Sequence, residues 1–363
     1  MSGSERYIGL MSGTSLDGVD AALVDFSGAR PDCIGTSYLP YPDDLRQEIL
    51  SLHIDGPAEL HRAALVSRRL ANLYAAATKA VLGDGDPAGI RAIGCHGQTV
   101  RHVPRSGYTL QLNQPALLAE LAGIAVVADF RSRDIAAGGQ GAPLVPAFHH
   151  AAFHLSGKHR VIVNIGGIAN ISNLDHPQPV TGFDCGPGNM LMDAWVHQHT
   201  GRAYDENGAW GARGRVLAPL LSRLLSHEFF AAAPPKSCGR EQFGLDWLLS
   251  QLDGSEDPVD VQATLTELTA IGIAGAISRW CNGPDEVYLC GGGAHNALLR
   301  QSLERLLPDV MVAGTEALGL PVDWVEAVAF AWLARQTLLG LPGNLPEVTG
   351  AKGLRVLGAI YPA

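Results

Sequence analysis

The sequence predicts an α/β protein built from two similar domains around a central cleft. Each half of the chain begins with a strand, a glycine-rich turn and a returning strand. Each half then alternates helical and strand patterns. At roughly 150 residues per domain, a chain of 363 residues has room for two cores.

In the first half, strands are expected at residues 7–10, 20–26, 34–39, 91–95 and 124–128. The last two are continuously apolar, as is typical of strands covered on both faces. A long helix is expected over residues 58–82, because Val66, Leu70 and Leu73 begin a series of apolar side chains at spacings of three and four.

The second half repeats this order. Its strands are expected at residues 160–165, 168–173, 182–184, 286–290 and 310–312. Its helices are expected at residues 189–200, 261–280, 296–306 and 322–338. We expect one domain to hold residues 1–137 and a loop-like tail, 341–363, and the other to hold residues 138–340. The segment 138–146, rich in glycine and proline, is the expected hinge.

Composition excludes several classes of protein. With 47% hydrophobic and 17% charged residues, the chain is unlike a disordered protein, and its 43 glycines lack the period of collagen. A net charge of −10 disfavours nucleic acid. No apolar run approaches the roughly 18 residues of a membrane span, and no secretory signal is visible. Six scattered cysteines without a CxxC pair fit a reducing compartment. We expect a cytoplasmic protein without a membrane partner.

The first candidate site is the turn of the first half, formed by Gly13, Thr14, Ser15, Leu16, Asp17, Gly18, Val19 and Asp20. Glycines let backbone N–H groups approach an anion, and hydroxyls add donors. The Asp17 carboxylate beside such a loop suits Mg²⁺ or a water. No Gly-Lys-Ser/Thr ends the turn, so it is not a Walker A loop. An ordinary hairpin turn is the alternative.

The second half carries two more glycine-rich turns. Asn164, Gly166 and Gly167 occupy the matching hairpin, and two such hairpins facing each other across a cleft would clamp a nucleotide. Gly291, Gly292 and Gly293 stand between a strand and a helix, where a nucleoside could approach closely. Tight turns without a ligand are the alternative for both.

Asp184 is the candidate for acid–base chemistry. It ends an apparent strand and precedes a turn into a helix. Ligands bind at such strand ends in open α/β sheets. A carboxylate there can accept a proton from a hydroxyl or a water. A turn or helix-capping aspartate is the alternative.

Polar side chains at other strand ends are candidates for substrate binding: His96, Gln98, Thr99 and Arg131. Arg131 could reach an anionic group, or could pair with Asp129 or Asp134 instead. His150 and His154 are spaced to share a helical face and could bind a metal. No glutamate follows His150 as in a zincin, and we expect no metal centre made of protein ligands.

Long motifs along the whole chain resemble the anhydro-N-acetylmuramic acid kinase family. They lie at residues 9–20, 95–99, 128–131, 138–144, 182–195, 235–241, 289–296 and 324–327. Cys238 stands where the family usually has a small hydroxyl residue. The resemblance implies two ribonuclease-H-like domains in the ATPase fold of actin, Hsp70 and the sugar kinases.

The resemblance also implies a reaction in bacterial cell-wall recycling. ATP with Mg²⁺ would phosphorylate 1,6-anhydro-N-acetylmuramic acid while the anhydro bridge is cleaved, giving N-acetylmuramic acid 6-phosphate and ADP. By resemblance, residues 13–20 would bind ATP, Asp184 would be the catalytic base, and the protein would be a homodimer. We further assign Arg131 to the lactyl carboxylate and Glu326 to polar groups in the cleft.

Three other functions fit parts of the pattern. An ordinary hexose or amino-sugar kinase of the same fold would phosphorylate a free hydroxyl. An ATP-gated binding module, like a chaperone, would hydrolyse ATP slowly and without sugar dependence. A metal-dependent protein would use His150 and His154.

Overall fold

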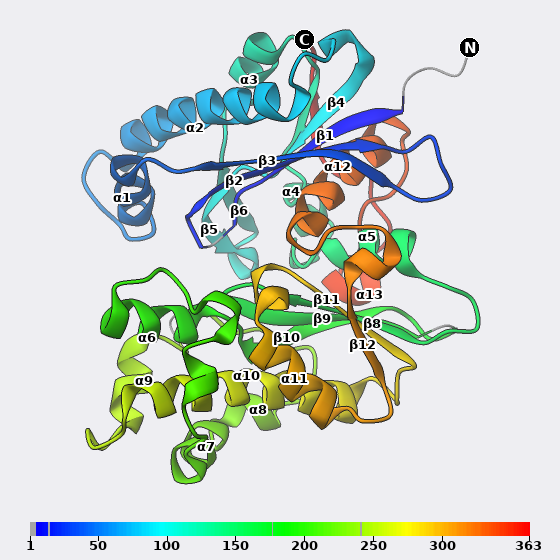
Figure 1. Cartoon of the computed structure of the whole chain (residues 1–363). Coiled ribbons are helices and arrows are strands. Elements are labelled where there is room, and N and C mark those ends of the chain that lie inside the picture. Colours follow the sequence, from blue (N-terminus) through cyan, green and yellow to red (C-terminus); the bar gives the residue numbers. More distant parts are fainter. Residues whose placement is uncertain (1–4, 14, 176, 240–241) are drawn as a thin grey trace. The chain divides into compact units, whose positions relative to one another are not determined.

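The computed structural model describes residues 5–13, 15–175, 177–239 and 242–363 (Figure 1). The chain divides into two compact units. Unit 1 comprises the residues up to Ala152 together with Trp324–Ala363, and unit 2 comprises Phe153–Asp323.

Unit 1 contains a six-stranded sheet in the order β13-β7-β4-β1-β2-β3. Its strands are β1 (Arg6–Met11), β2 (Gly18–Asp25), β3 (Asp32–Pro40), β4 (Ile90–Cys95), β7 (Val126–Ala128) and β13 (Ala359–Tyr361). The first three strands are antiparallel, and β4 and β7 continue the sheet in parallel with β1. A separate hairpin is formed by β5 (Gln98–Val103) and β6 (Tyr108–Leu112).

Helices cover both faces of this sheet (Figure 1). The helices of unit 1 are α1 (Asp43–Ser51), α2 (Glu59–Leu82), α3 (Pro115–Ala122), α4 (Ser132–Ala136), α5 (Val145–Phe153), α12 (Val325–Leu338) and α13 (Pro346–Thr349). Ile8 and Leu10 of β1 share a buried core with Leu70 of α2. Gly9, between them, faces α12, because successive residues of a strand point to opposite faces.

Unit 2 repeats this topology. Its sheet has the order β10-β9-β8-β11-β12. Its strands are β8 (Arg160–Ile165), β9 (Ile168–Leu174), β10 (Thr181–Pro187), β11 (Glu286–Cys290) and β12 (Met311–Gly314). Its helices are α6 (Met190–Thr200), α7 (Ala218–Leu225), α8 (Glu228–Ala231), α9 (Leu245–Gln251), α10 (Pro258–Trp280) and α11 (Ala297–Leu306). As in unit 1, three antiparallel strands precede the parallel ones. The predicted α/β class with two similar sheets is confirmed.

The bounds of the two units differ from the expected domains at two places. Residues 138–152 and α12 lie in unit 1. Helix α12 belongs to unit 1 because it packs closely on β1 and β4. At Gly9 and Gly94 the backbone of α12 lies so near the strands that a side chain would not fit. The tail also differs from the predicted loop, because it ends in β13, which pairs antiparallel with β7.

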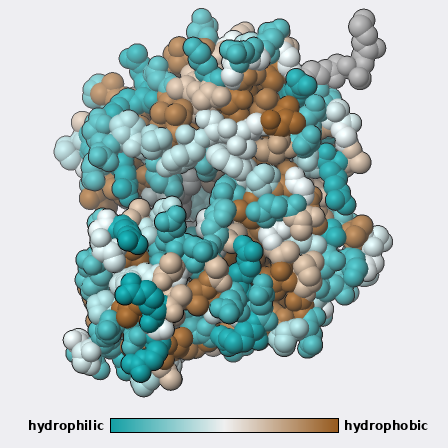
Figure 2. All heavy atoms as spheres, in the orientation of Figure 1, coloured by the Kyte–Doolittle hydropathy of each residue, from teal (hydrophilic) through white to brown (hydrophobic). Residues whose placement is uncertain are grey.

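Among the described residues, one helix, α10, is long and apolar enough to span a membrane by length and composition. Most of it is buried inside unit 2, as is typical of a core helix. On the face shown in Figure 2, hydrophobic residues occur in small groups among hydrophilic ones.

Candidate active site

The turn between β1 and β2 is fixed by side chains from later parts of the chain. His96 Nδ1 lies 3.1 Å from the carbonyl oxygen of Ser12, and Gln98 Nε2 donates to the carbonyl oxygen of Gly13 at 3.2 Å. The Tyr41 hydroxyl donates to Gln98 Oε1 at 3.0 Å. His96 and Gln98 are buried. These two predicted substrate-binding residues therefore support the turn itself.

After Gly13, the groups that the turn presents are backbone atoms and the exposed carboxylate of Asp17. The Ser15 hydroxyl donates to Asp17 Oδ1 at 2.7 Å, and the carbonyl oxygen of Asp17 accepts from Tyr41 N at 2.9 Å. The Asp17 side chain is exposed, whereas Leu16 and Val19 are buried in the core. Asp20 is partly buried on β2. Thr14 lies outside the described residues.

In unit 2, the turn between β8 and β9 packs against the start of α6. The amides of Gly188 and Asn189 donate to the carbonyl oxygens of Gly167 and Gly166 at 2.9 and 2.8 Å. The Asn189 side-chain amide donates to the carbonyl oxygen of Ile165 at 3.1 Å. Asn189 was not among the predicted site residues, although its position directly after Gly-Pro-Gly placed it in the same motif.

The run Gly291–Gly293 joins this cluster. A Cβ on Gly291 would lie 2.5 Å from Asn164 Oδ1, and one on Gly293 would overlap the Ile165 side chain. The structure thus brings together the predicted residues at 164–167 and 291–293.

The glycines at the two hairpin tips are not needed for packing. An added Cβ would have its nearest neighbour at 3.6 Å on Gly13, 3.7 Å on Gly166 and 3.8 Å on Gly167. In contrast, a Cβ on Gly18 would overlap the carbonyl oxygen of Leu39, and one on Gly188 that of Gly166. The tips therefore expose open backbone, while the flanking glycines let neighbouring segments pack closely.

Asp184 lies inside β10 rather than at its end, which differs from the prediction. The strand continues to Pro187, and its pairing with β9 is irregular between Asp184 and Gly186. Asp184 Oδ2 accepts a hydrogen bond from the Cys238 amide at 3.0 Å. Burial raises the pKa of Asp184 to about 6, although the Cys238 amide and the Lys236 ammonium group oppose this shift.

The segment around Lys236 runs beside β10. Asp184 N donates to the carbonyl oxygen of Lys236 at 3.1 Å. Lys236 Nζ donates to the carbonyl oxygen of Phe229 at 3.0 Å and stands 4.5 Å from the centre of the Phe229 ring. This segment therefore carries two groups that stabilise the charged form of Asp184.

Arg131 is held in a fixed orientation in unit 1. Its Nε and one terminal nitrogen donate to His96 Nε2 at 3.2 and 2.8 Å, and the other terminal nitrogen donates to the carbonyl oxygen of Gly141 at 2.8 Å. Burial and the Arg131 charge lower the pKa of His96 to about 3. His96 is therefore neutral, with its proton on Nδ1 facing the Ser12 carbonyl oxygen.

Two more predicted residues are near this group or on the adjoining hairpin. Glu326 lies in the first turn of α12. Burial lowers the pKa of Arg131 to about 10, and the negative charge of Glu326 opposes this shift. Thr99, on β5, accepts a hydrogen bond from Gln111 at 3.1 Å. Asp134, one of the two acids considered as an Arg131 partner, instead accepts hydrogen bonds from Gly141, Asn344 and Thr349.

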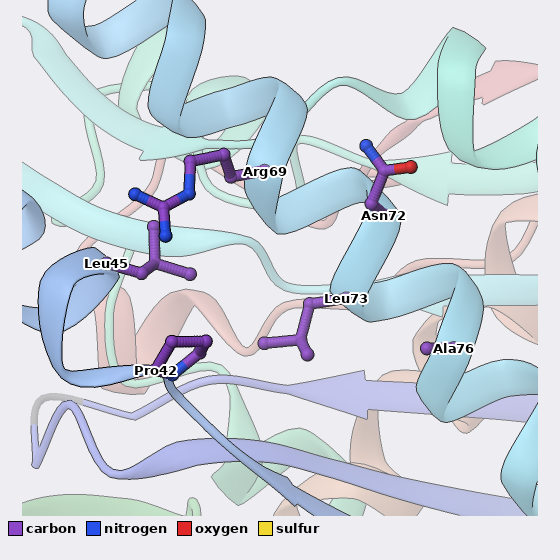
Figure 3. A pocket seen from close by; sticks show the side chains of 6 residues that line it. All are labelled: Pro42, Leu45, Arg69, Asn72, Leu73 and Ala76. Carbon is purple, nitrogen blue, oxygen red and sulfur yellow. The ribbon is translucent and has the colours of Figure 1, made fainter.

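Other features of the described residues do not form a second site. No group of three or more histidine, cysteine or acidic side chains there could hold a metal ion. A shallow groove of about 370 Å³ lies between α1 and α2 (Figure 3). Leu45 and Leu73 line it, and the only charged lining residue, Arg69, pairs with Asp44 and Glu48. None of the predicted site residues lines this groove.

The comparison with solved structures supports the fold. The (R)-2-hydroxyglutaryl-CoA dehydratase component A of Acidaminococcus fermentans matches with a TM-score of 0.50 and 14% identity, over 90% of this chain and 96% of that one. At that identity the likeness concerns the fold alone. It agrees with two α/β units of the actin, Hsp70 and sugar-kinase type.

The comparison with protein sequences goes further. The family model described as anhydro-N-acetylmuramic acid kinase matches residues 5–363. The anhydro-N-acetylmuramic acid kinase of Thiobacillus denitrificans is 57% identical over 99% of this chain and 98% of its own length. That of Nitrosospira multiformis is 56% identical over 98% and 99%. The chain therefore belongs to the anhydro-N-acetylmuramic acid kinase family and is a phosphotransferase.

Proposed function

We propose that the chain opens 1,6-anhydro-N-acetylmuramic acid with water and transfers the γ-phosphoryl group of ATP to O6. The sugar has no free 6-hydroxyl group, because O6 is bonded to C1. Water therefore attacks C1, the C1–O6 bond breaks, and O6 forms the new bond to phosphorus. The products are N-acetylmuramic acid 6-phosphate and ADP, and the pathway is peptidoglycan recycling.

The buried, hydrogen-bonded carboxylate of Asp184 is the observation that carries this proposal. Water attacking C1 must lose a proton, and a carboxylate with a pKa of about 6 is a competent base at neutral pH. The Cys238 amide donates to Oδ2 and so orients the carboxylate, and we assign Oδ1 to take the proton. Phosphoryl transfer itself mainly requires positioning and neutralisation of charge.

The two hairpin tips fit the nucleotide. Open backbone at Gly13, Gly166 and Gly167 would approach the phosphates, with Asn164 and the run 291–293 toward the nucleoside. The exposed oxygens of Asp17 suit a hard cation such as Mg²⁺. When bound with ATP, Mg²⁺ would neutralise charge on the phosphates.

The residues around Arg131 fit the sugar. We assign the guanidinium of Arg131 to the lactyl carboxylate, because arginine binds carboxylates through paired N–H bonds. Glu326 would bind sugar hydroxyl or amide groups. Thr99, with His96 and Gln98 behind the turn, would complete this side of the site.

Product analysis in ¹⁸O-labelled water tests the reaction. We expect ADP release with the anhydro sugar to exceed that with N-acetylglucosamine or N-acetylmuramic acid. Solvent oxygen should enter C1 during turnover, and early reduction of the product would control for exchange through ring opening. Faster turnover of the free sugars would instead indicate an ordinary amino-sugar kinase, and sugar-independent ADP release an ATP-gated binding module.

Replacing Lys236 with methionine should move the acidic limb of the pH profile. The Lys236 ammonium group lowers the pKa of Asp184, so its loss raises this pKa above about 6. Because the base must be deprotonated, kcat/KM should then fall at a higher pH, with a larger loss at pH 6 than at pH 8. Lys158→Met, which removes an exposed lysine of the same unit, should leave the profile in place. An unshifted profile in Lys236→Met would exclude this electrostatic role.

We also propose that the protein is a cytoplasmic homodimer. ATP and the sugar would meet in that compartment, and light scattering on the purified protein would measure the mass of the assembly.

A further inference from the structure

A buried acid, Asp134, lies three residues after Arg131 and is fully shielded from solvent. Its Oδ1 accepts hydrogen bonds from the Asn344 side-chain amide and the Thr349 hydroxyl, each at 2.8 Å. Its Oδ2 accepts from the Gly141 amide at 2.8 Å. Asp134 thus joins α4 to the glycine-rich segment and to the tail of the chain.

Burying a carboxylate is costly unless its oxygens are satisfied. In the described part of the chain, Asp134 forms no ion pair, and its stabilisation comes from these three neutral donors. Without the acid, the Gly141 amide, the Asn344 side-chain amide and the Thr349 hydroxyl would lose their acceptor. The acid is therefore better explained by what it holds in place.

What Asp134 holds is the segment that contacts Arg131. Gly141 donates its amide to Asp134 and accepts the Arg131 guanidinium at its carbonyl oxygen, at 2.8 Å in both cases. Gly141 has a φ of +69°, and a Cβ on Gly139 would overlap Asp134 Oδ2. The segment is shaped to fit around the carboxylate.

The tail closes the arrangement from the other side. Gln140 N donates to the carbonyl oxygen of Thr349 at 2.8 Å, and Lys352 N donates to that of Ala137 at 2.9 Å. Asn344 Oδ1 also accepts from Arg355 N at 2.7 Å, so the side chain that reaches Asp134 is itself fixed. The tail therefore clamps both ends of the segment 137–141.

The contacts of Arg131 show why its orientation matters. A guanidinium has five N–H bonds, and the contacts to His96 and Gly141 use one on each of its three nitrogens. Within the described residues, these contacts leave one N–H bond on each terminal nitrogen. Such a pair matches the two oxygens of a carboxylate only when the guanidinium plane is held correctly.

We infer that Asp134 is a positioning residue for Arg131, and that through it the C-terminal tail shapes the part of the site that selects a sugar bearing a carboxylate. This inference rests on the proposed contact between Arg131 and the lactyl group. Asp134 itself does not touch the substrate.

The test compares two sugars that differ in the lactyl group. Dissociation constants for 1,6-anhydro-N-acetylmuramic acid and 1,6-anhydro-N-acetylglucosamine would be measured by calorimetry on the full chain. Arg131→Ala should reduce the preference for the lactyl sugar by about tenfold to hundredfold, the effect of losing a charge-assisted contact. Asp134→Asn places an NH₂ group or an uncharged oxygen against the Gly141 amide, and should reduce the same preference by about tenfold.

A double variant separates positioning from general damage. If Asp134 acts through Arg131, Asp134→Asn should cause no further loss of preference in the Arg131→Ala background. Asp44→Asn, which removes an exposed charge from the same unit, should leave the preference unchanged. Thr349→Val removes one donor to Asp134 and should act in the same direction, which keeps the test usable if Asp134→Asn does not fold.

The outcomes distinguish the two ideas. An unchanged preference in Arg131→Ala would overturn the proposed lactyl contact. A lost preference in Arg131→Ala, with the preference retained in folded Asp134→Asn or Thr349→Val, would overturn the positioning role alone. Additive losses in the double variant would also overturn it.

Discussion

Replacing Asp184 with asparagine should lower kcat by about 10²- to 10⁴-fold, the usual contribution of a positioned general base. The amide has nearly the shape of the carboxylate and can still accept from the Cys238 amide, but it cannot take a proton from water. ATP affinity should change little, because the nucleotide is assigned to the hairpin tips. A coupled ADP-release assay and calorimetry with ATP would measure the two effects.

The same substitution should stabilise the folded protein at neutral pH. Burial raises the pKa of Asp184 from 3.8 to about 6, so the native state holds its proton more tightly than the unfolded chain does. Stability from this group is therefore present below pH 3.8 and is lost as pH rises toward 6. The asparagine side chain carries no charge at either pH, so Asp184→Asn should gain Tm relative to the parent above pH 6 but not at pH 4.

Asp253→Asn is the matched control, because Asp253 is an exposed acid of the same unit. It should retain turnover. Parent-like turnover in Asp184→Asn would remove Asp184 from the role of base. A large loss of ATP affinity would mean that the residue acts on the nucleotide instead.

The sequence predicted the repeated topology because its signals are local. Each hairpin shows two apolar runs around a glycine turn, and these runs match β1 and β2 in unit 1 and β8 and β9 in unit 2, although β2 ends at Asp25, one residue before the predicted end. Short elements such as α1 and α3 were not predicted, since one or two turns of helix give too little periodicity to detect.

The supporting contacts of the candidate site could not be predicted in this way. His96 meets the carbonyl oxygen of Ser12 across 84 positions of sequence, and Asn344 meets Asp134 across 210. No local pattern specifies such pairs. The order of residues placed His96 and Gln98 after a strand, but did not indicate that they stand behind the first turn.

The glycines of the motifs fall into two groups, those with open backbone and those needed for close packing. We read most of the motif glycines as backbone open to ligands, and Gly13, Gly166 and Gly167 fit this interpretation. Others serve packing inside a unit. On the face of the unit 1 sheet that α12 covers, Gly9 of β1 and Gly94 of β4 pair directly and form a flat surface. That surface explains why α12 belongs to unit 1.

Gly9→Ala should therefore destabilise the protein by about 3 kcal/mol, at the upper end of typical overpacking costs. The new methyl group would overlap the carbonyl oxygen of Ala327 and lie 2.7 Å from Ala331 N. Both are backbone atoms of α12, so no side-chain rotation relieves the clash and the helix must move. The Tm of unit 1 should fall by about 5–10 °C.

The displacement should also reach the proposed sugar side, because Ala327 directly follows Glu326 in the first turn of α12. We expect the KM for the sugar to rise in Gly9→Ala, while the affinity for ATP changes less. Gly89→Ala makes the same chemical change in unit 1 where an added Cβ meets nothing within 4 Å, and it should keep the parent Tm. Calorimetric scans of both variants decide the matter: equal Tm values would show that α12 adapts to the methyl group without cost, and that Gly9 is not required for its packing.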